Sequence, residues 1–171
     1  MPDRPEPQVD LHRQVQAAIT THDLQGAGSV ADVLAAVARH RGRPVELQAL
    51  PADSEVGEVF GLCLPYPDRD VILYRAGAGA DHELHSTLHE CGHLLLDHVA
   101  PARQAAPTTR LEALLPDLDP DLIAGVLARS AYADEQERQA ETFAMLVRAG
   151  ITDAQRRRGD DVLTRFDDVL G

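Results

Sequence analysis

Two histidines and a glutamate in the segment LHSTLHECGHLLLDHV, residues 84–99, have the types and spacing needed to bind and use a metal ion. His89 and His93 stand four residues apart, so on a helix their imidazoles lie on one face and can bind the same ion. Glu90 then projects to the side of that face, where it can reach a water in an open coordination position and act as general base. The pattern is HExxH, which is typical of zinc metallopeptidases.

The surroundings of the motif favour a metal site over a chance pattern. Five of the eight histidines fall within residues 82–98. Leucines around the motif predict a buried helix, in which unpaired imidazoles would be costly. The alternative interpretation is an amphipathic helix that carries a structural histidine cluster.

A catalytic zinc normally has three protein ligands and one open position. In the metzincin pattern a histidine stands six residues after the second motif histidine, but here Val99 holds that position and His98 is out by one residue. A carboxylate on a later helix is therefore expected as the third ligand. The segment DEQERQAETFA, residues 134–144, offers Glu137 and Glu141 on one helix face, and their spacing leaves the choice between them open.

Other residues near the two motifs are further candidates for a functional or packing role. His85, one turn before His89, and Tyr132 are candidates for substrate contacts or for stabilising the oxyanion, with a structural role as the alternative for each. Cys91 lies about two hundred degrees around the helix from the first histidine, which favours a packed small residue over a ligand. Ala140 is small enough to let the two helices approach closely.

Helices must position both motifs. Residues 29–42, SVADVLAAVARHRG, have Ser29 as N-cap and Gly42 as C-cap of a helix. The motif helix is expected to follow Asp81 as its N-cap. Residues 134–150 form a strong helical pattern that Gly150 ends, and a short closing helix comes after it.

Three short segments predict strands, because they alternate in part and are rich in β-branched or aromatic residues: RPVELQAL, GEVFGLCLP and RDVILYR. The expected fold is therefore α+β, with a small, about three-stranded antiparallel sheet packed with helices around a zincin-like HExxH helix. Residues 1–8 hold three prolines and are expected to form a disordered leader, and residues 9–171 a single domain.

Composition excludes several classes of function. The formal charge of −12 disfavours direct contact with nucleic acid, because phosphate backbones would be repelled. All sixteen basic residues are arginine, which excludes mechanisms that need a lysine. No apolar run approaches the roughly twenty residues of a membrane span. The two cysteines make no disulfide framework and the polar N-terminus lacks a signal-peptide pattern, so a cytoplasmic protein is expected.

The two motifs resemble those of the ImmA/IrrE family of bacterial zinc metallopeptidases. STLHECGHLLLDH followed by ERQAETFAMLV is similar to the family's HELGHLLLH helix and its later E-x-x-A-[ND]-x-F-A, over roughly residues 44–149. The resemblance implies Zn²⁺ as cofactor, His89, His93 and Glu137 as its ligands, and Glu90 as the catalytic base. The chain departs from the pattern at Cys91 and at the glutamate that replaces the usual Asn or Asp.

The resemblance also implies a role in regulating transcription or a stress response, by site-specific cleavage of a helix-turn-helix repressor. The acidity of the chain fits a basic DNA-binding protein as partner. The alternative is a non-proteolytic module of the anti-repressor or toxin–antitoxin type, in which zinc has a structural or regulatory role. Glu90 argues against that alternative, because a purely structural zinc site needs no general base.

Overall fold

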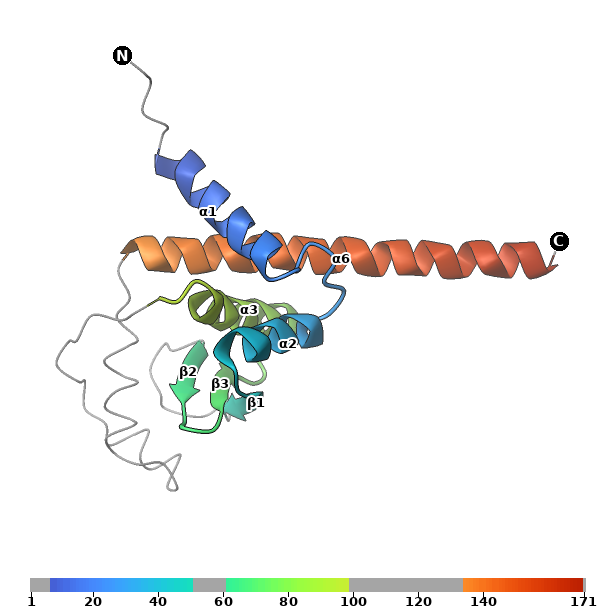
Figure 1. Ribbon diagram of the computed structural model, residues 1–171. Helices are drawn as coiled ribbons and strands as arrows, with labels where there is room; N and C mark the ends of the chain where they lie inside the picture. Colours follow the sequence, from blue (N-terminus) through green and yellow to red (C-terminus); the bar gives the residue numbers. More distant parts are fainter. Residues whose placement is uncertain (1–6, 51–60, 99–133, 171) are drawn as a thin grey trace, which may run out of the picture.

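In the computed structural model, residues 7–50, 61–98 and 134–170 are described. A small sheet forms one layer, α2 and α3 cover one of its faces, and α6 runs across the far side of α3 with α1 against it (Figure 1). The elements are α1 (Pro7–Thr21), α2 (Val30–Arg41), β1 (Val45–Leu50), β2 (Gly61–Pro65), β3 (Asp70–Arg75), α3 (Ala80–Leu95) and α6 (Asp134–Leu170). The expected α+β class is confirmed.

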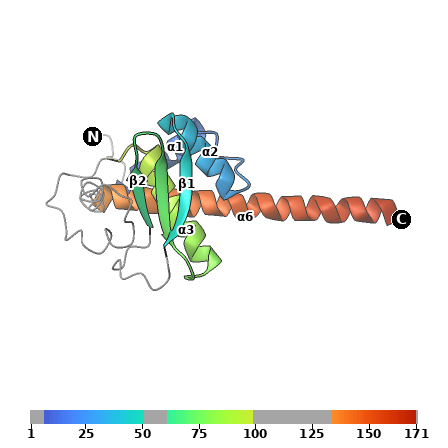
Figure 2. The same cartoon turned by 90° about the horizontal axis from the view of Figure 1, so that it is seen from below.

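The three expected strands form a mixed sheet of order β1-β3-β2 (Figure 2). β2 and β3 are antiparallel, as expected, and the backbone N–H of Tyr66 donates to the Arg69 carbonyl in the turn between them. β1 runs parallel to β3, so the prediction of an all-antiparallel sheet was wrong. Alternation of apolar and polar residues identifies a strand but not the strand with which it pairs. The central strand of this sheet is β3, whose first four residues are buried.

Both expected caps of α2 are confirmed. The Ser29 hydroxyl accepts a hydrogen bond from the backbone N–H of Asp32, and the Asp32 carboxylate accepts one in return from the Ser29 hydroxyl. Gly42 has φ +66° and ends the helix in the left-handed conformation that glycine adopts without steric cost.

Other helix boundaries differ from expectation. α1 begins at Pro7, two residues inside the expected leader, since proline is well suited to a first helical turn; residues 1–6 lie outside the described part. Asp81 is not the N-cap of α3: it lies in the first turn, 3.0 Å from the Arg148 guanidinium of α6. α6 continues through Gly150 and includes the expected closing helix, because packing of that turn overrides the weak helix preference of one glycine.

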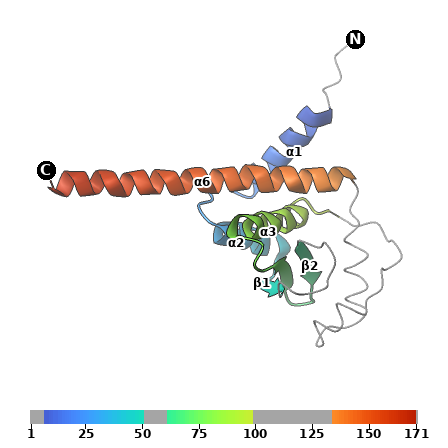
Figure 3. The ribbon, with the colours of Figure 1, turned by 180° about the vertical axis from the view of Figure 1, so that it is seen from behind.

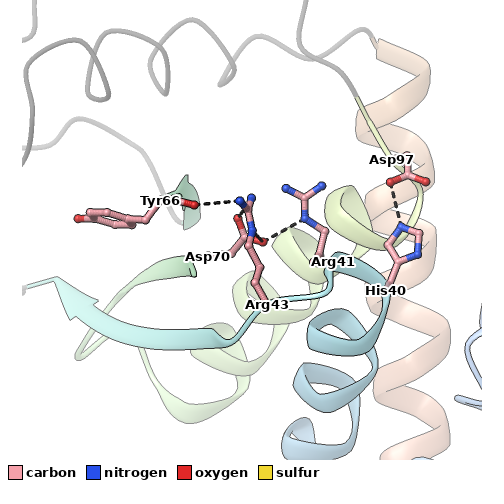
Figure 4. Close-up of polar contacts among 6 residues, drawn as sticks. All are labelled: His40, Arg41, Arg43, Tyr66, Asp70 and Asp97. Atoms are coloured by element: carbon pink, nitrogen blue, oxygen red, sulfur yellow. Dashed lines mark hydrogen bonds and ion pairs between the residues drawn. The ribbon is translucent and has the colours of Figure 1, made fainter. Parts of the chain in front are cut away.

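A cluster of ion pairs around one buried carboxylate joins the sheet to the end of α2 (Figure 4). Asp70 at the start of β3 has no exposed surface and accepts hydrogen bonds from the guanidinium groups of Arg41 and Arg43. Arg43 also donates to the Tyr66 carbonyl at 2.9 Å. Two arginines compensate the cost of burying the carboxylate, which fixes the chain between α2 and β1 against β3.

The motif helix packs closely against α6, as the views from both sides show (Figures 1 and 3). Gly92 makes this possible: a Cβ atom there would lie 3.1 Å from the Phe143 ring and 3.2 Å from the Ala140 Cα. The Ala140 and Phe143 side chains are fully buried, so the expected close approach at Ala140 is confirmed. The contact belongs to a core to which α1, α2, β3, α3 and α6 all contribute. Among the described helices, none is both long and apolar enough to span a membrane.

We expect Gly92→Val to lower the free energy of unfolding by about 1–3 kcal/mol, because the added methyl groups overpack the contact with α6. Gly150→Ala is the matched control, since nothing lies within 4 Å of its Cβ position and alanine is the better helix former. It should raise the free energy of unfolding by about 0.5–1 kcal/mol. Urea denaturation followed by circular dichroism measures both, and equal stability of Gly92→Val and the parent protein would contradict the packing described.

Candidate metal centre

Three side chains from two helices converge at the start of the α3–α6 contact. The His89 and His93 Nε2 atoms lie 3.0 Å apart, and the Glu137 carboxylate lies 3.3 Å from the first and 3.6 Å from the second. Tetrahedral zinc with bonds of about 2.0–2.1 Å separates its ligand atoms by about 3.3–3.4 Å. The two histidine nitrogens face different oxygens of the Glu137 carboxylate, Oε2 from His89 and Oε1 from His93, and one ligand atom from each residue lies within 4.8 Å of the others, so the cluster could hold a metal ion.

The protonation of His93 suits a ligand. Its side chain is 1% exposed. Burial, with smaller contributions from the nearby His89 and His98, lowers the pKa of His93 to about 2. The imidazole is therefore neutral at physiological pH and has one nitrogen lone pair available for a metal.

Glu90 directly follows His89 on α3, and its buried side chain lies against β2, an edge strand among the described strands. Burial, and secondarily the charge of Glu137, raises the pKa of Glu90 to about 8. A Cβ atom at Gly61 would lie 2.9 Å from Glu90 Oε1 and 3.0 Å from its Cγ. The absence of a side chain at the start of β2 thus leaves the space that the carboxylate occupies.

Glu141, the other possible third ligand, lies one turn further along α6. Its carboxylate lies 3.0 Å from His85 Nε2 and 3.6 Å from His89 Nδ1, the nitrogen that faces away from the cluster. The group that could hold a metal ion includes Glu137 and leaves Glu141 out. Glu141 instead makes its hydrogen bond with His85, and its 3.6 Å separation from His89 Nδ1 is longer than a hydrogen bond.

The remaining candidates have different outcomes. His85 lies on α3 one turn from His89, with its Nε2 held by Glu141 rather than by a group of the cluster. Tyr132 lies outside the described residues. Cys91 is fully buried in the core, and burial raises the pKa of its thiol, so it is a packed residue as expected.

Sequence reasoning missed three residues around the cluster. Gly61 was assigned only to a strand, and nothing in the sequence indicates that a glutamate fills its side-chain space. His98 was weighed only as a misplaced metzincin ligand, yet its ring lies against His93 at a centroid distance of 5.0 Å. Gln139 received no role, although it stands two residues after Glu137 and its amide oxygen lies 2.9 Å from His98 Nε2.

Comparison of the chain with protein-family models, curated proteins and solved structures found no match.

We expect the purified protein to bind about one zinc ion per chain, and both His93→Ala and Glu137→Ala to lose it. Glu141→Ala is the matched control, because it removes a carboxylate one turn along the same helix that the geometry places outside the cluster. It should retain the metal, with affinity reduced by no more than about 10–100-fold. Elemental analysis after dialysis measures the zinc content of each variant. If Glu137→Ala kept the zinc and Glu141→Ala lost it, Glu141 and not Glu137 would be the third ligand.

Proposed function

We propose that the chain is a zinc-dependent endopeptidase that cuts a protein substrate at a specific site. The observation that carries the proposal is the position of Glu90, a buried residue that directly follows His89 on α3 and is close enough to Glu137 for that charge to raise its pKa. A structural zinc site usually has four protein ligands and needs no carboxylate beside it. Three ligands and an adjacent base are the arrangement of a hydrolytic site.

The residues divide the chemistry between them. His89, His93 and Glu137 would hold the metal, which when bound supplies a water of lowered pKa and polarises the scissile carbonyl. Glu90 would take the proton of the attacking water and pass it to the leaving amine. Its burial favours the protonated carboxyl, which helps Glu90 to hold the proton between the two transfers.

The edge strand β2 offers a place for an extended peptide. Among the described strands it pairs with β3 alone, and Gly61 at its start lies against the Glu90 carboxylate. A substrate that adds to this edge by main-chain hydrogen bonds would run past the base. This arrangement favours an unfolded or extended segment of the substrate as the site of cleavage.

Charge and sequence resemblance support the class of substrate. The formal charge of −12 favours a basic partner, and the two motifs resemble the ImmA/IrrE peptidases. We therefore assign the substrate as a DNA-binding repressor of the helix-turn-helix type. Neither Cys63 nor Cys91 is in a disulfide, which fits a reducing cytoplasm as the place of action.

Glu90→Gln is expected to reduce peptide cleavage by about 10²–10⁴-fold, because it removes the general base. Zinc content should not change, since all three ligands remain. The experiment compares new peptide termini that the zinc-loaded parent and variant produce from a bacterial peptide library, with mass spectrometry as readout. Glu135→Gln, an exposed glutamate in the first turn of α6, is the matched control and should cleave like the parent.

The same comparison decides the alternative function. The cleavage assay is repeated on any repressor that purifies together with the protein. If the zinc-loaded parent produces no new peptide termini that depend on Glu90 from either the library or that repressor, the endopeptidase proposal fails. A stable complex with that repressor would then identify the chain as a non-proteolytic antagonist.

Gly61→Ala is expected to reduce cleavage while zinc binding stays unchanged. The new methyl group would meet the end of the Glu90 side chain, which must move, and the Ser86 carbonyl at 3.3 Å limits where the strand can shift. The expected loss is about 10²-fold, the usual cost of displacing a reacting group by about 1 Å. Kinetics on a peptide from the library and elemental analysis test this, and unchanged kinetics would contradict the placement of the Glu90 carboxylate against Gly61.

A further inference from the structure

The chain turns sharply after α3 and brings a third histidine back against the second. Asp97 adopts φ +51°, and the backbone N–H of His98 donates to the His93 carbonyl at 3.0 Å. This is the hydrogen bond of a Schellman motif, in which a residue in the left-handed conformation ends the helix. His40 of α2 contacts the Asp97 carboxylate at 2.9 Å and holds the turn from outside (Figure 4). The turn fixes the His98 ring next to that of His93.

A chain of side-chain hydrogen bonds begins at this pair and ends on α1. His93 Nδ1 lies 2.9 Å from His98 Nδ1, and His98 Nε2 lies 2.9 Å from the Gln139 amide oxygen. The Gln139 amide nitrogen donates to the Gln14 oxygen at 2.7 Å. The Gln14 nitrogen donates to the Asp10 carboxylate at 3.2 Å. Four links thus join the proposed metal ligand to the first helix.

The carboxylate at the far end sets the direction of every link. A carboxylate only accepts, so Gln14 must turn its nitrogen toward Asp10 and its oxygen toward Gln139. Gln139 then offers its nitrogen to Gln14 and its oxygen to His98. A neutral His98 then carries its proton on Nε2, which leaves its Nδ1 as an acceptor. His93 therefore donates from Nδ1, and its Nε2, the atom of the metal cluster, has no proton.

We propose that His98, itself oriented by Gln139, is a positioning residue that holds His93 as the tautomer able to bind metal. The proposal deepens the proposed function and rests on it, since it assigns a second partner to a ligand of the same site. If every hydrogen bond in this series ran in the opposite direction, His93 would carry its proton on Nε2 and could not bind the metal through that atom. The outer links lie near the surface, whereas His93 is 2% exposed, so the inner link to His98 carries most of the orientation.

The experiment uses ¹⁵N-labelled, zinc-free protein, in which long-range ¹H–¹⁵N spectra report the protonated nitrogen of each imidazole. In the parent, His93 should be protonated on Nδ1, and in His98→Ala it should become a mixture of both tautomers. Zinc affinity, measured by competition with a chromophoric chelator, should fall about 10–100-fold in the same variant. His98→Asn should restore most of both properties, because its amide oxygen can take the place of Nδ1 as acceptor.

Asp97→Gly is the matched control. It removes the neighbouring side chain and its contact with His40, but glycine keeps the left-handed turn, so tautomer and zinc affinity should stay those of the parent. A His93 protonated on Nε2 in the parent, or a tautomer that His98→Ala leaves unchanged, would overturn the proposal. A parent protein that binds no zinc would instead overturn the metal centre, and the spectra of the zinc-free protein distinguish the two failures.

Discussion

The close contact between α3 and α6 is the constraint on which the rest of the structure depends. Gly92 lets the two helices approach until its Cα faces Ala140 and Phe143. Only at that separation can a carboxylate on α6 reach two imidazoles on α3, because a glutamate side chain extends only a few ångströms. The same contact buries His93 and thereby keeps it neutral. The α3–α6 contact thus determines both the packing of the two helices and the position and protonation of the potential metal ligands.

Much of the fold follows from local pattern. Ser29 and Gly42 are capping residues of the types that helix ends need, and three apolar segments between turn signals became three strands. The pairing of the strands and the length of α6 did not follow from local pattern, because both depend on contacts between residues that are distant in the sequence. The parallel pairing of β1 with β3 coincides with the burial of Asp70 between two arginines. A single glycine at residue 150 could not show that α6 continues beyond it.

For the candidate site, spacing was most informative within one helix. His89 and His93 share a face because residues four apart always do in a helix. The choice between Glu137 and Glu141 could not be made from spacing, since it depends on how α6 is placed along α3. The contacts of the surrounding residues could not be predicted either, because they depend on how the chain folds. His98 reaches His93 through a turn, and Gln139 and Gln14 meet across two helices that are separated by more than a hundred residues.

If the three potential ligands bind an ion, their division between α3 and α6 would couple folding to the supply of that metal. An ion that binds only when the two helices are packed stabilises the folded chain by RT ln(1 + [L]/Kd), which is about 4 kcal/mol at a thousandfold excess over the dissociation constant. That is a large fraction of the stability of an ordinary domain. If the cluster holds an ion in the cell, the lifetime and abundance of the protein there would rise and fall with the supply of that metal.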